Sequence, residues 1–296
     1  MTIDGRYTGD SAHRHPVFFE NDDDHIIPAV TLVGGASAYA DRPEGTDFDL
    51  DVARGAISGY SRVQKFGHNT NVLTSGTGAD IWSAGGDYTG FIQAALPVRI
   101  KAGGSAADDS GGLGAQSVTV SGVDETWTEV TETIVTNGST VSLPTATSFI
   151  RINRAWVAGV GAYGVANTGA IVIENTTPVV MAEIEALEGQ SQMAITHVPA
   201  GKTAYLTAIR IFVGGGSSKT ATVMLYRREN ADTTSAPFGP KRLVQSFDVL
   251  HGGSEFATEF RSYNSFPAKT DIWVRGISQT TAQAVNCTFD YFLVSD

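Results

Sequence analysis

The feature of this sequence that most restricts its fold is a series of short runs in which apolar and polar residues alternate, each closed by a turn-forming residue. Alternation at period two is typical of half-buried β-strands. The 33 glycines and the low share of charged residues, 17%, also favour strands and turns over helices. We therefore predict an all-β fold with antiparallel sheets. Two runs show the pattern best, on the face made by Tyr205, Thr207, Ile209, Ile211 and Val213 and on the face made by Cys287, Phe289, Tyr291 and Leu293.

Three other segments give more specific predictions. Asn137–Gly138 is a strong hairpin signal, so the strand before it should return through 139–143. In 149–157, alternation predicts that Ile150, Ile152 and Trp156 face the core while Arg151 and Asn153 point away. The segment 181–187 could form a helical turn.

A chain of 296 residues is long enough for two domains with separate cores. The polar, turn-rich part of the sequence ends near residue 53, and we predict an extended N-terminal arm over 1–53, a first β-sandwich domain over 54–180 and a second β-sandwich or jelly-roll domain over 181–296. Repeats of fixed period are absent, which argues against a propeller or a solenoid.

The predicted arm contains an acidic run, several prolines and few apolar residues. Such a segment buries too little apolar area to offset its own chain entropy, so it should lie against another surface. Its apolar patch, 25–33, could form a strand that ends at Gly34–Gly35. From this patch we predict partner contacts by His25, Ile26, Ile27, Val30 and Leu32.

The stretch 54–91 leads into the folded body and adds two predicted contact residues, Phe66 and Trp82. Residues 80–82 look like a short strand, and Gly85–Gly86 should form a turn, because residues without Cβ adopt positive φ at little cost. Trp82, beside this turn, is the tryptophan we expect to be most exposed. The expected role of the tryptophans is core packing, and the alternative is stacking on a sugar. They are at positions 82, 127, 156 and 273.

Five segments resemble a family of tailed-bacteriophage virion structural proteins often seen in marine phages. The segments are VQKFGHN (63–69), ADIWSAGGDYTGF (79–91), ATSFIRINRAWV (146–157), VPAGKTAYLTAIRIF (198–212) and KTDIWVRGIS (269–278). The resemblance covers about residues 54–296. It implies a place in the phage particle, assembled in the host cytoplasm, and brings no catalytic or binding residues with it.

Charge and targeting signals narrow the partners. The net charge of −11 argues against direct contact with nucleic acid, which requires clustered Lys and Arg. The two basic pairs, Arg227–Arg228 and Lys241–Arg242, are interpreted as solvated strand ends or loops. We find neither a secretory signal nor an apolar run long enough to span a membrane. The single cysteine, Cys287, is predicted to be buried and inert.

No motif for catalysis, phosphate binding or a cysteine metal site is present. Two acidic clusters could take a cation: His13 and His15 with residues 22–25, and the loop 107–111. A solvated arm and a plain loop explain these clusters as well, so we predict no metal, no cofactor and no catalytic residue.

The resemblance implies a virion protein, and the lack of a catalytic motif agrees with it, so we predict a non-enzymatic bacteriophage virion structural protein. It would be a capsid-surface decoration or cement protein, or a tail, collar or baseplate component, held to other virion proteins by subunit interfaces. A homotrimer is the assembly expected by analogy. The alternative is a host-receptor module of the phage tail that binds a glycan. An enzyme acting on polysaccharide would need two facing carboxylates, and no pair stands out.

Overall fold

The computed structural model describes residues 18–20, 26–28, 48–74, 78–214, 220–249, 255–279 and 281–296. Nearly all regular structure in them is β, and every strand pair is antiparallel, which confirms the predicted fold class. The helix α1 (Phe48–Ala53) is the exception. The chain divides after Asp47 into an N-terminal unit and a body over 48–296.

In the N-terminal unit, β1 (Phe18–Glu20) pairs with β2 (Ile26–Pro28). Strand β2 lies within the predicted strand 25–33 and contains two of the predicted contact residues, Ile26 and Ile27. The other three in the arm, His25, Val30 and Leu32, lie outside the described residues, as do the histidines and the acidic run of the possible cation site.

Two sheets of the body enclose its larger core. One has the order β12-β17-β14-β15, with β4 (Ala79–Asp80) also paired to β17, and the other has the order β16-β13-β18-β3. Apolar side chains from both sheets form one buried cluster. The strand bounds are β12 (Ile195–His197), β17 (Asp271–Ser278), β14 (Ala221–Arg228), β15 (Arg242–Val249), β16 (Glu255–Phe266), β13 (Lys202–Val213), β18 (Gln283–Ser295) and β3 (Tyr60–Val72).

Two smaller sheets enclose a second buried cluster, and their orders are β11-β10-β5-β8 and β7-β6-β9. This cluster also takes in Trp82, Met193 and Trp273, so the second core continues into the strands of the first pair of sheets. The bounds are β5 (Leu96–Ile100), β6 (Ala115–Val123), β7 (Glu129–Val135), β8 (Ser148–Phe149), β9 (Arg151–Val160), β10 (Ile171–Asn175) and β11 (Val180–Ile184).

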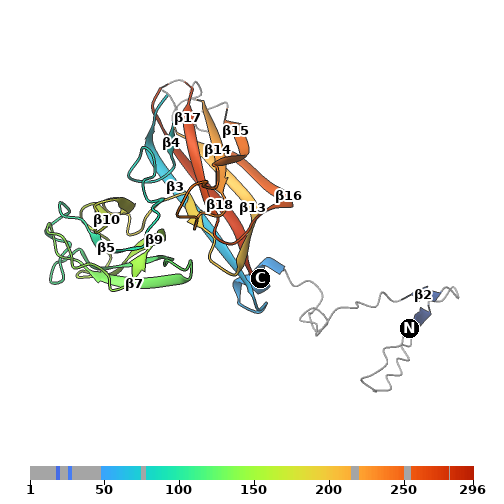
Figure 1. Ribbon diagram of the computed structural model, residues 1–296, viewed down its shortest axis with the longest axis horizontal. Helices are drawn as coiled ribbons and strands as arrows, with labels where there is room; N and C mark the ends of the chain where they lie inside the picture. The colour runs from blue at the N-terminus through green and yellow to red at the C-terminus, as the bar shows by residue number, and fades with distance from the viewer. Residues whose placement is uncertain are drawn as a thin grey trace, which may run out of the picture. The chain divides into compact units, whose positions relative to one another are not determined.

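The sheets do not follow chain order. Strand β3 pairs along its length with β18, and β4 pairs with β17, so residues 60–72 and 79–80 lie in sheets with strands that follow residue 195. Figure 1 shows β3, in blue, among the orange and red strands, while β5, β7, β9 and β10 gather apart from them. The predicted boundary at 180 instead groups residues 60–80 with these latter strands.

Two glycine positions explain features of the stretch 54–91. Gly85 and Gly86 have φ of 69° and 64°, which confirms the predicted turn. At Gly67, in the middle of β3, an added Cβ would lie 2.2 Å from the backbone nitrogen of Ala194 and 2.4 Å from the carbonyl oxygen of Ile81. Strand β3 can therefore approach these residues only with glycine at this position.

Three local predictions were wrong. In β13 a bulge between Leu206 and Ala208 reverses the alternation, so Ala204 and Leu206, rather than Tyr205 and Thr207, share the buried face with Ile209. Residues 139–143 do not form a strand, because β7 pairs with β6 instead. Residues 181–187 do not form a helical turn, because most of them belong to β11.

Candidate functional site

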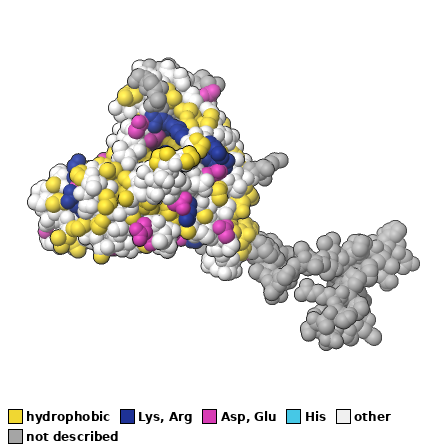
Figure 2. Space-filling view, viewed as in Figure 1, with side chains coloured by type: hydrophobic (Ala, Val, Ile, Leu, Met, Phe, Trp, Pro, Cys, Tyr) yellow, Lys and Arg dark blue, Asp and Glu magenta, His cyan; other side chains and the backbone are white. Residues whose placement is uncertain are grey.

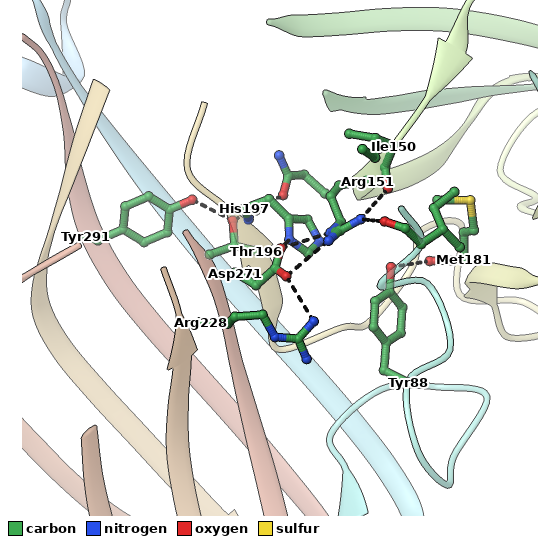
Figure 3. Close-up of polar contacts among 11 residues, drawn as sticks. Tyr88, Ile150, Arg151, Met181, Thr196, His197, Arg228, Asp271 and Tyr291 are labelled. Atoms are coloured by element: carbon green, nitrogen blue, oxygen red, sulfur yellow. Dashed lines mark hydrogen bonds and ion pairs between the residues drawn. The ribbon is translucent and has the colours of Figure 1, made fainter. Parts of the chain in front are cut away.

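A buried carboxylate, Asp271, joins three strands of the body. At the start of β17, its Oδ1 accepts hydrogen bonds from Arg151 Nε of β9 at 2.9 Å and from His197 Nδ1 of β12 at 2.8 Å. Its Oδ2 accepts from Arg151 Nη2 at 3.2 Å, and Arg228 Nη1 of β14 lies 3.9 Å away. Figure 3 shows Arg228 approaching Asp271 from the opposite side to His197 and Arg151. We call these four residues the Asp271 cluster.

The electrostatics of the Asp271 cluster follow from its burial. Burial alone would raise the pKa of Asp271, but the charge of Arg151 and the hydrogen bond from His197 outweigh it, so the pKa is lowered. Burial lowers the pKa of His197 to about 4, against the opposing effect of Asp271. His197 is therefore neutral at pH 7 and donates from Nδ1, while its buried Nε2 has no hydrogen-bond partner among the described residues.

On its Arg228 side, the Asp271 cluster borders a pocket of about 280 Å³, which we call the aromatic pocket. Phe91 lines it, and the guanidinium groups of Arg151 and Arg228 lie 5.7 and 5.1 Å from the ring centroid of Phe91. Lys241 Nζ lies 3.8 Å from the ring centroid of Tyr226. Figure 2 shows Lys and Arg side chains gathered on the part of the body where Figure 1 places β14 and β15.

His197 also lines a groove between β3 and β9. Two adjoining hollows of about 520 and 440 Å³ form this groove and share Arg154, Trp156 and Gln190. Aromatic rings and amides line it together: Phe66 and Trp156 are half-buried, and Gln64, Asn153 and Gln190 add polar groups. Arg154 lies over Phe66, 5.7 Å from the ring centroid, and donates from Nη2 to the Gln64 carbonyl at 2.8 Å.

The groove also contains the buried amine of Lys65. Its Nζ donates to the Asn153 carbonyl, and among the described residues no carboxylate pairs with it or with Arg154. Burial, and then the charge of Arg154, lower the pKa of Lys65 well below its ordinary value. Buried ionisable groups with strongly shifted pKa values gather at functional sites.

The two contact residues that the sequence predicts in the body, Phe66 and Trp82, have different environments. Phe66 lines the groove, whereas Trp82 is only 3% exposed and packs edge-to-face on Tyr88, with ring centroids 5.0 Å apart. The expectation of an exposed Trp82 was wrong, because the turn beside it is closed by a bond from Trp82 Nε1 to the Gly86 carbonyl at 3.3 Å. Trp156 is the tryptophan that lines the groove.

Sequence reasoning missed the Asp271 cluster and misplaced Arg151. Alternation within β9 predicted Arg151 to point away from the core, yet it is 1% exposed, with its guanidinium 5.4 Å from the Trp127 ring centroid. The available signal was a charged residue inside an otherwise apolar run, FIRI. Its partner, Asp271, lies 120 residues away, so spacing along the chain could not connect them.

In the second acidic segment that could take a cation, the loop 107–111, one carboxylate is already used in hydrogen bonds to the backbone. Asp108 is buried, and its two oxygens accept from the backbone N–H groups of Ala115, Thr168 and Gly169 at 2.8–3.0 Å. In the described ranges, no group of three His, Cys, Asp or Glu side chains is placed to hold a metal ion. Nor is any helix in these ranges long and apolar enough to cross a membrane.

Comparisons with known proteins find little similarity to this chain. No protein-family model matches the chain, and neither does any curated protein. Among solved structures, the infectious bursal disease virus Gt strain matches with a TM-score of 0.23 and 7% identity, over 80% of this chain and 73% of the other. The Gx strain of the same virus matches with a TM-score of 0.22 and 9% identity, over 80% and 75%. Similarity at these TM-scores does not establish a shared fold.

Proposed function

We propose that this chain is a non-enzymatic structural protein of a tailed-phage virion, attached to a neighbouring virion protein through its N-terminal unit. The observation that carries the proposal is the division after Asp47, which separates a short polar segment from a body with its own cores. The body begins at α1, where Val52 and Phe48 pack with Phe292 of β18. The attachment segment is therefore 1–47, six residues shorter than the predicted arm.

The sequence resemblance given above also supports this proposal. We propose that the chain is a capsid-surface decoration or cement protein or a tail, collar or baseplate component, and that it assembles as a homotrimer. Fractionated heads and tails distinguish the two locations.

Deleting residues 1–47 is expected to abolish binding to virions while leaving the body folded, because α1 and its contacts are retained. The measurement is co-sedimentation of the full chain and of the deleted chain with phage heads, phage tails and host cells. Circular dichroism shows whether the body is still folded. The deletion of 1–53 serves as a comparison and should lose stability, since it removes the packing of Phe48 and Val52. Binding of the deleted chain to virions at full strength would contradict the proposal.

A second candidate, a glycan-binding module, is favoured by the groove. Half-buried aromatic rings suit the apolar faces of sugars, and side-chain amides suit their hydroxyl groups. Phe66 and Trp156 supply the rings, while Gln64, Asn153 and Gln190 supply the amides. Arg154 has no carboxylate partner among the described residues. Of the two glutamates that line the groove, Glu129 is paired with Lys202 and Glu188 accepts from Gln192, so Arg154 favours a sugar that carries acid groups.

Replacing Trp156 by alanine is expected to weaken binding to alginate, a polyuronate, by about tenfold, because the ring face is lost. Dextran, a neutral glucan, should bind more weakly than alginate to the unchanged protein. Affinity electrophoresis in gels that contain each polymer measures both. Tyr163→Ala is the matched control, because Tyr163 is a fully exposed aromatic residue outside the groove. If alginate does not retard the unchanged protein, or if both variants lose affinity equally, this candidate fails.

A further inference from the structure

The aromatic pocket differs from the rest of this acidic protein in its charge. Three of its lining residues are cationic, Arg151, Arg228 and Lys241, and no acidic residue lines it. Asp271, which lies 3.9 Å from Arg228, is fully buried and already accepts three hydrogen bonds from Arg151 and His197. With His197 neutral, Asp271 is the only negative charge in the Asp271 cluster, against the three positive charges that line the pocket. Asp80 and Asp87 also act on Lys241, but both are paired with Arg275.

Two of these cations, Arg228 and Lys241, lie against aromatic rings, whereas Arg151 is paired with Asp271. Arg228 lies 5.1 Å from the ring centroid of Phe91 and 5.8 Å from that of Trp273, and Lys241 Nζ lies 5.7 Å from that of Trp273. A cation over an aromatic face is attracted to the ring without using its N–H donors. The rings thus fix the positions of Arg228 and Lys241 and leave their donors available.

These donors are largely unused. Arg228 contacts Asp271 only at 3.9 Å, which is beyond hydrogen-bond distance, and Lys241 has no ion pair in the described part of the chain. The neighbouring carboxylates are already paired, because Glu229 lies 3.2 Å from Arg242 and Asp232 lies 2.8 Å from Lys269. Burial, and then the charge of Arg275, lower the pKa of Lys241, and an anion in the pocket would oppose both effects.

We propose that the aromatic pocket binds a compact oxyanion, namely a sulfate, a phosphate or the carboxylate of a small acidic sugar, between Arg228 and Lys241. The planar guanidinium of Arg228 can donate to two oxygens of such a group. Lys241 can donate to a third oxygen and neutralise a second negative charge. Phe91 and Phe238 form the apolar walls against which a carbon skeleton would lie. At about 280 Å³ the pocket lies below the usual size for larger ligands, which restricts the ligand to a single small group.

The test is isothermal titration of the full chain with sodium sulfate, sodium phosphate and methyl glucuronide, each at constant ionic strength in chloride. We expect Arg228→Gln to weaken binding by about tenfold or more, as for loss of charged hydrogen bonds. Lys241→Gln should weaken it in the same direction. The matched control is Arg242→Gln, which removes the same charge from the neighbouring residue, because Arg242 does not line the pocket.

The arms of the experiment separate the two sources of the anion. Binding of sulfate or phosphate alone identifies a free inorganic anion, and binding of methyl glucuronide alone identifies a sugar acid. Absence of binding by all three overturns the proposal, and so does an equal loss in the Arg228→Gln and Arg242→Gln variants, which would indicate general charge attraction. If Arg228→Gln does not fold, the affinity of Lys241→Gln is compared with that of Arg242→Gln instead. Lys241→Gln should fold, because Lys241 is exposed and its replacement leaves Asp271 paired with Arg151.

Discussion

Replacing Asp271 by asparagine is expected to lower the free energy of unfolding by about 3–5 kcal/mol, because the substitution leaves the buried Arg151 without its counter-charge. The side chains of both residues are almost wholly inaccessible, at 0% and 2% exposed, so water cannot replace the lost partner. The measurement is unfolding in guanidinium chloride at pH 7.

Two further variants serve as controls for this prediction. Glu129→Gln breaks the exposed pair with Lys202 and should change stability by about 1 kcal/mol or less. The double variant Asp271→Asn with Arg151→Met should recover part of the loss, because the unpaired charge is then removed as well. A loss in Asp271→Asn no larger than that in Glu129→Gln would show that the Asp271 cluster does not stabilise the body.

Acidification from pH 6.5 to pH 4 is expected to destabilise the folded chain by about 3 kcal/mol through His197 alone. The folded pKa of His197, about 4, lies below that of an unfolded histidine, so in this range the unfolded chain takes up a proton that the folded chain does not. The contribution is therefore fully present above pH 6.5 and is lost as the pH falls towards 4. The lowered pKa of Asp271 also makes the folded chain less stable as the pH falls. This loss occurs at lower pH, below the pKa of an ordinary aspartate.

The measurement is the difference in unfolding free energy between the unchanged protein and His197→Asn across this range. The asparagine amide can donate to Asp271 in place of Nδ1 but does not titrate, so the difference should change by about 1.4 kcal/mol per pH unit. A difference that stays constant between pH 4 and 6.5 would contradict the prediction, whatever the stability of the variant at pH 7.

The class of the fold could be predicted from the sequence because alternation and turn chemistry are local signals. The run through Cys287, Phe289, Tyr291 and Leu293 lies on one buried face, and Gly85–Gly86 forms the expected turn. Where prediction failed, tertiary contacts decided the outcome. The bulge in β13 depends on register with β16 and β18, and no residue within β13 shows where the alternation will reverse.

Less of the candidate sites could be predicted. Phe66 was identified and lies in the groove, but the residues around it come from β3, β9, β12 and β18, so only the fold brings them together. The basic pairs at 227–228 and 241–242 appeared to be solvated strand ends. Pairing of β14 with β15 places Arg227 opposite Arg242, so that Arg228 and Lys241 line one pocket. Long-range pairing of this kind is not visible as a motif.

The place of β18 between β13 and β3 has a consequence for how the protein is made. During translation, β3 emerges more than two hundred residues before β18, its only strand partner within the described sheets. Until residues 283–295 have left the ribosome, β3 and β13 lack the strand that joins them, and their unpaired edges remain open to association with other chains. The larger core can therefore close only after most of the chain has been synthesised, and we expect its folding to be slow and dependent on protection of the nascent chain.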